Sequence, residues 1–409
     1  MHISRLSLTD YRNYGHAELL LEPGATVFAG RNGHGKTNLV EAIGYLSTLG
    51  SHRVSSEHAL IRAGADSAVI RALLAHAGRE VLVEVQLNRG AANKAQVNRN
   101  GVRTRELPRY THSVLFAPED LAIVRGDPGV RRRFLDDLLV QRMPRIAGVL
   151  ADYDRVLRQR NSLLKSARSS GLRNAQLPTL EIWDERLVEL GTEVIDRRAE
   201  LVADLAEPVR AAYRGIVDDD HAPRLEPRLS IDGAGEDLER SVAEPGPGAS
   251  TDDATPVASD TASRFRESLA GLRPKELERG VTLAGPHRDD VLLELNGLPA
   301  KGYASHGESW SFALALKIAS AELLRADSTT GDPVLILDDV FAELDRGRRD
   351  RLAASIGDFE QVLITAAVIE DVPESLAGRV VRIERGAIVG GSEEDGSEVG
   401  SRSEEVEDA

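Results

Sequence analysis

Apolar and polar residues alternate along the first part of the chain, which is the pattern of half-buried strands. Leu6 and Leu8 flank a single polar residue, and a compact apolar run ends at Phe28. We therefore predict short strands over residues 3–28, with a hairpin turn later at 98–101. The same reasoning predicts further strands over 67–74, 80–87, 281–283, 290–295, 334–337 and 362–365.

A helical period of 3.6 replaces the strand pattern in the middle of the chain. Directly after a glycine-rich loop, Leu39, Val40 and Ile43 already recur at the spacing of one helix face. From about residue 118 this spacing dominates, and in 131–143 it places several apolar residues on one face. Further amphipathic helices are predicted over 145–165, 180–216 and 308–325.

The order of these elements predicts an α/β fold with mixed β-sheets that is interrupted by a helical second domain. Residues 229–262 are rich in Gly, Pro, Ser and Asp and poor in large apolar residues, so we predict a disordered insertion there. The predicted segments are 1–115 and 271–391 for the two parts of the α/β domain, 116–270 for the helical domain and 392–409 for a disordered acidic tail.

Composition narrows the class of protein. The chain has 409 residues and no cysteine, which excludes disulfides and cysteine-ligated metal centres. It has no apolar run near the roughly 18 residues that a membrane span needs, and its start lacks the apolar core of a signal peptide. We therefore expect a cytoplasmic protein without a membrane partner.

The net charge of -15 is unevenly distributed. The predicted insertion 229–262 and tail 392–409 hold 16 of the 66 acidic residues but only two of the 51 basic ones. The rest of the chain is therefore close to neutral, which is compatible with a basic patch on one face.

A phosphate-binding loop is predicted between the strand that ends at Phe28 and the helix that follows. The motif G-x-x-x-x-G-K-[ST] is matched by Gly30, Arg31, Asn32, Gly33, His34, Gly35, Lys36 and Thr37, and Asn38 follows it. Glycines let backbone N–H groups turn toward phosphate oxygens, and the helix N-terminus adds its positive dipole end. Lys36 would reach the terminal phosphates and Thr37 would ligate Mg²⁺. The alternative, a flexible turn with an incidental lysine, fits this context poorly.

Two acidic residues end the apolar strand predicted at 334–337. Asp338 and Asp339 would face a ligand crevice, because the carboxyl end of a parallel strand borders it. Asp338 would hold Mg²⁺, and Asp339 would polarise an attacking water. A solvated acidic turn is the alternative, which the nearby phosphate loop disfavours.

A second candidate phosphate contact precedes the helix predicted at 308–325. Ser305, Gly307 and Glu308 offer a hydroxyl, a backbone N–H and a helix N-terminus. Alone, the same residues would also form an ordinary capping box, with Glu308 as the reciprocal partner of Ser305.

The phosphate loop, the Ser-x-Gly-Glu segment and Asp-Asp-x-x-x-x-Leu-Asp occur in the order of the Walker A, signature and Walker B motifs of ABC-type ATPases. The chain resembles that superfamily, in which the signature contacts ATP held by a second protomer. The resemblance implies an ABC-type head, ATP and Mg²⁺ as ligands, a homodimer formed on ATP binding, and catalytic roles for Lys36 and Asp339.

Within the superfamily the chain resembles the RecF family. The spacing of about 270 residues between Lys36 and Ser305 is longer than in transporter subunits and shorter than in proteins with long coiled coils. Segments similar to the family's motifs are Leu8–Tyr14, Leu115–Leu121, Gly126–Asp136, Gly285–Asp290 and Ala313–Lys317. A transporter ATPase subunit is the alternative, against which the spacing argues. A P-loop GTPase switch and a nucleotide-binding scaffold without turnover are further alternatives.

The RecF resemblance implies a weak DNA-stimulated ATPase that acts in recombinational repair. It would bind single-stranded and gapped double-stranded DNA and help RecO and RecR to load RecA. The sequence departs from the family where Glu308 replaces the usual glutamine and Trp310 a usual arginine. No histidine lies in 361–367 to act as a switch, and Thr365 is the nearest polar candidate there.

Three further charged segments have both structural and functional interpretations. Residues 131–133 are arginines that would pair with Asp136 and Asp137 or contact a phosphate backbone or a second protomer. Residues 287–290 would form a structural hydrogen-bond cluster or lie near nucleotide or DNA. Residues 11–13 would be plain strand and turn residues or lie beside the nucleotide.

Overall fold

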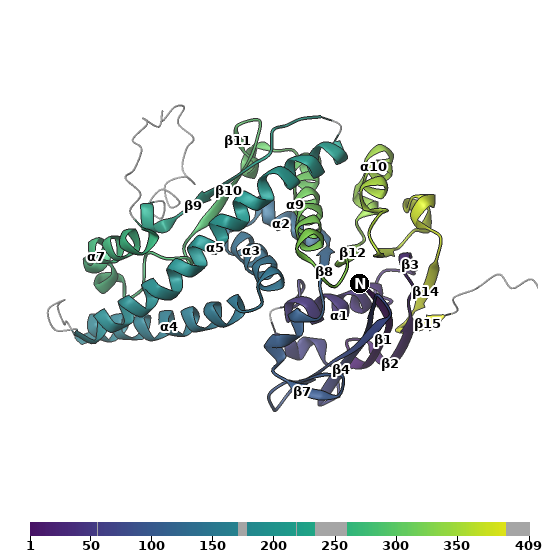
Figure 1. Cartoon of the computed structure of the whole chain (residues 1–409), viewed down its shortest axis with the longest axis horizontal. Coiled ribbons are helices and arrows are strands. Elements are labelled where there is room, and N and C mark those ends of the chain that lie inside the picture. Colours follow the sequence, from purple (N-terminus) through teal and green to yellow (C-terminus); the bar gives the residue numbers. More distant parts are fainter. Residues whose placement is uncertain (55, 171–177, 218, 234–259, 390–409) are drawn as a thin grey trace, which may run out of the picture.

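The computed structural model describes residues 1–54, 56–170, 178–217, 219–233 and 260–389 (Figure 1). The predicted tail 392–409 lies outside the described residues, as does most of the predicted insertion 229–262. The two ends of that insertion are structured, because Ser230–Asp232 form a short 3-10 helix and α7 (Thr261–Arg279) begins at residue 261.

A six-stranded sheet forms the centre of the head, in the order β15-β14-β3-β13-β12-β8. All neighbours run parallel except β15, which pairs antiparallel with β14. The sheet therefore joins parts of the chain that are hundreds of residues apart. The strands are β3 (Gly24–Ala29), β8 (Ser113–Phe116), β12 (Val334–Asp338), β13 (Gln361–Ala366), β14 (Val380–Glu384) and β15 (Ala387–Val389).

Both faces of this sheet are covered, which explains the unbroken apolar run in β12. Val334 and Ile336 pack into a core with α1 (Lys36–Thr48) and the N-terminal strands. Leu335 and Leu337 point the other way, into a core with α9 (His306–Asp327) and α5 (Pro178–Val217). The alternation along one strand thus fixes which helices cover which face.

A second, antiparallel sheet has the order β2-β1-β4-β5-β6-β7. Its hairpin turn lies at Asn98 and Arg99, whose positive φ values of 50° and 66° suit a tight two-residue turn and confirm the predicted hairpin. The strands are β1 (His2–Tyr11), β2 (Tyr14–Leu20), β4 (Ser67–His76), β5 (Arg79–Asn88), β6 (Lys94–Val97) and β7 (Asn100–Val102).

The helices α4 (Ile146–Ser170), α5 and α7 form an arm that extends away from the two sheets (Figure 1). The remaining α-helices of the described residues are α2 (Leu121–Arg125), α3 (Pro128–Arg142), α8 (Ala300–Tyr303) and α10 (Arg346–Ile356), of which α3 and α10 both pack against α5. A small antiparallel sheet of β9 (Arg224–Arg228), β10 (Asp290–Leu295) and β11 (Leu298–Pro299) runs along the arm. Within the described residues no helix is long and apolar enough to cross a membrane.

The predicted strand at 281–283 is wrong, since this stretch is a loop. The backbone N–H groups of Thr282 and Leu283 donate to side chains, the amide oxygen of Asn161 (2.7 Å) and the carboxylate of Glu276 (2.8 Å). These side-chain acceptors replace the neighbouring strand that a β-strand would need. Conversely, β9 lies within the predicted helical domain 116–270, in a stretch where no strand was expected.

A buried arginine holds the arm together. Arg160 on α4 is fully buried and donates to Asp184 (2.7 Å), Glu276 (2.6 Å) and Thr282 (2.8 Å). Its partners come from α5, α7 and the loop after α7, so one guanidinium joins four segments. Such a buried charge is tolerated only because each donor has a partner.

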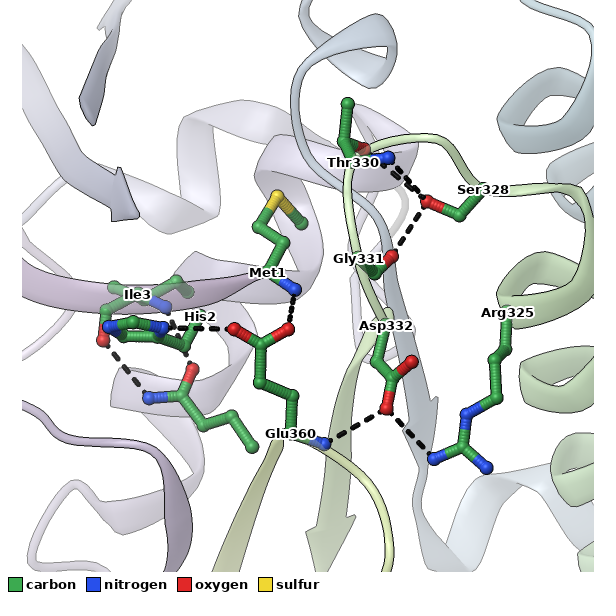
Figure 2. Close-up of polar contacts among 10 residues, drawn as sticks. Met1, His2, Ile3, Arg325, Ser328, Thr330, Gly331, Asp332 and Glu360 are labelled. Carbon is green, nitrogen blue, oxygen red and sulfur yellow. Dashed lines mark hydrogen bonds and ion pairs between the residues drawn. The ribbon is translucent and has the colours of Figure 1, made fainter. Parts of the chain in front are cut away.

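A polar cluster connects the first strand to the end of α9 (Figure 2). The Met1 nitrogen and the His2 ring both contact the carboxylate of Glu360. Asp332 accepts hydrogen bonds from Arg325 (2.9 Å) and from the backbone N–H of Glu360 (3.0 Å). The cluster therefore fixes the connection between α9 and β12 against β1 and the start of β13.

Candidate nucleotide-binding site

The predicted phosphate loop connects β3 to α1, as the motif requires. Gly35 caps α1 with a φ of 113°, and Gly33 also has a positive φ of 81°, so both positions favour glycine. A Cβ on Gly30 would lie 2.3 Å from the carbonyl oxygen of Ile383, so β14 leaves no room for a side chain there. The glycines thus shape the loop through conformation at two positions and close packing at a third.

Lys36 is buried, although a lysine ammonium is normally exposed. Its Nζ donates to the carbonyl oxygen of Gly30 (2.8 Å) and contacts the amide oxygen of Asn32 (3.3 Å). Arg31, Asn32 and Gly33 are exposed at the tip of the loop. The ammonium is therefore held by neutral oxygens inside the loop, where a phosphate oxygen would be a stronger partner.

Two threonines hold Asp338 at the end of β12. Its Oδ1 accepts hydrogen bonds from the hydroxyl groups of Thr365 (2.6 Å) and Thr37 (2.9 Å). Burial raises the pKa of the Asp338 carboxyl, although these two hydrogen bonds oppose the shift. The phosphate loop and the acidic strand end thus meet directly, and Thr365 supplies a contact from β13.

Asp339 adopts a strained backbone conformation next to this contact. Its φ of 52° is uncommon outside glycine, and its N–H donates to the Thr365 hydroxyl (3.0 Å). Burial raises the pKa of its carboxyl, and the nearby charge of Lys36 opposes that shift. Asp339 therefore lies within electrostatic reach of Lys36 without an ion pair to it.

Residues in the turn between β1 and β2, and at the start of β2, contact the phosphate loop. The Asn13 side chain donates to the carbonyl oxygen of His34 (3.2 Å) and accepts from the Asn38 side chain (2.7 Å). The Tyr14 hydroxyl donates to the carbonyl oxygen of Gly35 (3.0 Å). Of the residues at 11–13, Asn13 thus lies at the loop, and Tyr14 is an additional contact that sequence reasoning missed.

Arg12 belongs to a neighbouring ion pair. Its guanidinium makes two hydrogen bonds, at 2.8 and 2.5 Å, to Glu41 on α1, which is almost completely buried. Burial would raise the pKa of Glu41, but hydrogen bonds from Arg12 and Ser51 outweigh it and lower that pKa. The pair fixes the orientation of α1 against β1, and no pattern in the sequence indicated it.

A cleft of about 910 Å³ opens beside α1. Lys317 on α9 and Asp120 lie in its wall and form an ion pair of 3.0 Å. Asp137 from α3 also lines the cleft, and burial raises its pKa to about 7. Two segments that the RecF resemblance singled out, 115–121 and 313–317, are therefore in contact here.

The Ser-x-Gly-Glu segment begins α9 and forms the capping box that was its structural alternative. The Ser305 hydroxyl accepts from the N–H of Glu308 (3.3 Å), and the Glu308 carboxylate accepts from the N–H of Ser305 (2.7 Å). Among the described residues, no hydrogen bond or ion pair joins this segment to the phosphate loop. In Figure 1, β11, which shortly precedes Ser305, and α1 lie on opposite sides of α9.

Arg131 and Arg132 have structural partners, but not the expected ones. Arg131 is buried and binds Asp290 with two hydrogen bonds of 2.6 and 2.8 Å, and Arg132 donates to the carbonyl oxygen of Asp289. Asp136, which we expected to pair with an arginine of this run, binds Arg198 instead (2.8 Å). Two of the segments with open interpretations, 131–133 and 287–290, are thus joined to each other.

Comparison with known proteins identifies the family of this chain. The family described as RecF/RecN/SMC N terminal domain matches residues 2–384. The "DNA replication and repair protein RecF" of Leifsonia xyli subsp. xyli is 65% identical over 95% of this chain and 99% of that protein, and the protein of that name from Kineococcus radiotolerans is 53% identical over 96% of this chain and all of the relative.

Solved structures agree as well. The structure of the recombination mediator protein RecF with ATPrS in the RecFOR pathway is 26% identical, with a TM-score of 0.81 over 95% of this chain and 97% of that one. The corresponding structure with ATP has a TM-score of 0.80. The family model, the relatives and the solved structures all point the same way, and the chain belongs to the RecF family.

Proposed function

We propose that the protein is an ATP-dependent DNA-binding protein of recombinational repair. ATP would drive two copies together, and the dimer would bind gapped DNA and help RecO and RecR to load RecA. The observation that supports this most directly is the division of the site: Lys36 and the signature segment belong to one chain but do not meet within it. A nucleotide bound at the loop would therefore need a second copy to complete its contacts.

The phosphate loop supplies the first half of such a site. Backbone N–H groups at the start of α1, together with the ammonium of Lys36, would bind the β- and γ-phosphates. We assign nucleotide contacts to Gly30, Arg31, Asn32, Gly33, His34, Gly35, Lys36, Thr37 and Asn38. Binding would exchange the neutral oxygens that now hold Lys36 for charged ones, which strengthens the contact.

The residues at the end of β12 fit Mg²⁺. The hydroxyl oxygen of Thr37 and the carboxylate of Asp338 are 2.9 Å apart and are both hard oxygen donors. Mg²⁺ is typically held by one or two such protein oxygens, with phosphate and water oxygens completing the shell. In the described part of the chain, no group of three or more His, Cys, Asp or Glu residues is arranged to hold a metal ion. Phosphate and water oxygens would therefore have to complete the shell at Thr37 and Asp338. Bound there, the ion would neutralise phosphate charge.

Hydrolysis would depend on Asp339. Its carboxylate lies within electrostatic reach of Lys36 and its backbone N–H donates to Thr365, so it would be able to orient a water and accept its proton. Its raised pKa makes it a better base than an ordinary aspartate. Lys36 would stabilise the charge on the transferred phosphoryl group.

The proposal of DNA and of RecO and RecR as partners rests on the relatives of this chain. Proteins that share most of the chain are named for DNA replication and repair, and a solved one is described as a recombination mediator in the RecFOR pathway. Outside residues 229–262 and 392–409 the chain is close to neutral, which permits a basic contact surface despite the overall charge of -15.

Light scattering tests the proposal. We expect the molar mass to double when ATP and Mg²⁺ are added, to stay that of a monomer with ADP, and to increase further with gapped DNA. Lys36→Met should remove both ATP binding and the doubling, whereas Lys94→Met, at an exposed position on β6, serves as a matched control and should behave as wild type. A wild-type protein that stays monomeric at saturating ATP would contradict the proposal.

A further inference from the structure

Four arginines at one edge of the head take no part in the candidate nucleotide site. Arg99, Arg103, Arg105 and Arg109 lie within residues 99–109, a segment with a single acidic residue, Glu106. All four are exposed, and among the residues that the structure describes none of their guanidinium groups has a hydrogen bond or an ion pair. We call these four residues the arginine patch.

Many other arginines of the chain have acidic partners, which sets the patch apart. Arg131 is buried against Asp290, and even on the exposed arm Arg155 and Arg186 each pair with an acid three residues away. In the patch, four positive charges against one negative charge leave a local charge of +3, although the whole chain carries -15. The patch therefore keeps its positive charge available for an anionic partner.

The fold holds the patch in place. Arg99 lies in the tight turn between β6 and β7, where its φ of 66° is uncommon for a residue other than glycine. A 3-10 helix, Thr104–Arg109, follows β7 and packs against α1, with Leu107 and Pro108 buried. The arginines on either side of this buried pair are therefore carried at the surface by a well-anchored segment.

Positive charge at this edge also has a structural explanation. β7 is the last strand of its sheet (Figure 1), and charged residues discourage an exposed edge strand from pairing with another chain. That explanation suits Arg99 and Arg103, which flank β7. It does not account for Arg105 and Arg109, because they lie on the 3-10 helix, beyond the strand.

The chemistry of the patch suits a row of phosphate groups. A guanidinium matches a phosphate with two parallel hydrogen bonds, which a lysine ammonium cannot do. Arg99 and Arg103 are at most about 14 Å apart along the chain, and the 3-10 helix is about 12 Å long, so the patch is shorter than one turn of duplex DNA, about 34 Å. A single bound phosphate would leave most of the patch unpaired, whereas a DNA backbone offers phosphates to all four arginines.

We propose that the arginine patch binds the phosphate backbone of duplex DNA. The inference rests on the proposed function, in which the protein binds gapped DNA, and it assigns the duplex beside the gap to this edge of the head. Contacts to the backbone position the DNA and do not depend on its base sequence. They do depend on salt, because each one releases counterions from the DNA.

Fluorescence anisotropy with a labelled duplex tests this at several KCl concentrations, with Mg²⁺ and a slowly hydrolysed ATP analogue. We expect Arg103→Gln combined with Arg105→Gln to weaken duplex binding roughly tenfold. The slope of log K against log salt should become shallower by about 1.8, since each phosphate contact contributes about 0.9. Arg99→Gln combined with Arg109→Gln is a second, independent pair and should have the same effect.

Two controls separate the position of the charge from its amount and from folding. Arg155→Gln combined with Arg186→Gln removes the same charge from the arm, where both arginines are paired, and should leave affinity and slope unchanged. Arg103→Lys combined with Arg105→Lys keeps both charges and should retain the wild-type slope. Thermal unfolding and the doubling of molar mass with ATP should be unchanged in every variant.

The outcomes are distinct. If wild type binds the duplex and both glutamine pairs bind it with the same affinity and slope, the role of the patch is overturned and the proposed function stands. A glutamine pair that loses affinity only for single-stranded DNA, or that no longer doubles in mass with ATP, would overturn it as well. If wild type binds no DNA with the analogue, the proposed function fails and this inference fails with it.

Discussion

Single hydroxyl groups decide how the predicted site is assembled. The sequence indicated Asp338 and Thr37 separately, through two motifs 301 residues apart, and the structure joins them by one hydrogen bond of 2.9 Å. Thr365 had only been the nearest polar residue in a stretch without histidine, yet it binds Asp338 and the backbone of Asp339. Spacing motifs reveal residues that contact a ligand, whereas residues that orient them follow no fixed spacing.

Asp137 makes the stability of the protein depend on pH. Its pKa of about 7 in the folded protein lies above the ordinary value of 3.8, because burial disfavours the charged form. Its contribution to stability is therefore complete below about pH 4 and is lost as the pH rises through 7.

Asp137→Asn removes this penalty. We expect the variant to be more stable than wild type at pH 8, with a difference in denaturant midpoint that shrinks toward pH 4. Asp152→Asn, an exposed aspartate on α4, is the matched control and should show no such trend. A difference between Asp137→Asn and wild type that does not change with pH would show that the carboxyl group titrates normally.

At the scale of elements, periodicity predicted the long helices and the strands of the two large sheets. It predicted a strand at 281–283 that does not form and no strand at 224–228, where β9 does form, for one physical reason. Whether a short segment becomes a strand depends on the presence of a partner with free backbone groups. For β9 that partner is β10. In the loop at 281–283, the side chains of Asn161 and Glu276 accept hydrogen bonds from the backbone N–H groups instead. That information lies in tertiary contacts.

Arg131 joins α3 to β10 through a buried pair with Asp290. Arg131→Met should lower the free energy of unfolding by about 3–5 kcal/mol, because Asp290 would keep a buried charge without its partner. The double variant with Asp290→Leu should recover much of that loss, since no unpaired charge remains. Urea unfolding of the single and double variants measures both effects, and equal destabilisation by the two would contradict the explanation.

At the scale of the whole molecule, the sequence predicted both halves of the candidate site but not their surroundings. The phosphate loop, the acidic strand end and the signature segment each carry a local motif. His221 and Arg348 reach the signature from the end of α5 and from α10, so only the folded chain brings them to Glu308. The separation of the signature segment from the phosphate loop within one chain likewise appears only in three dimensions.

A composite site predicts complementation between two inactive variants. Lys36→Met lacks the phosphate contact and Ser305→Arg blocks the signature, so each alone should form no ATP dimer and show less than about a tenth of wild-type hydrolysis. Their mixture can form a heterodimer in which one site combines the intact Lys36 with the intact Ser305. Hydrolysis should therefore return on mixing, to at most half the wild-type rate per dimer. A mixture no more active than its components would argue for a site complete within one chain.

Because α5 is long, a small movement near the signature segment would produce a large displacement at the far end of the helix. The helix has 40 residues, and it touches α4 and α7 at one end and α9 and α10 at the other, where Arg351 of α10 donates to the carbonyl oxygen of Ile216 (2.7 Å). At 1.5 Å per residue it is a rod of about 60 Å, so a tilt of about 5° at the α10 end would displace its tip by about 5 Å. A small tilt of α5 where it meets α9 and α10 would thus produce a much larger displacement at the far end of the arm.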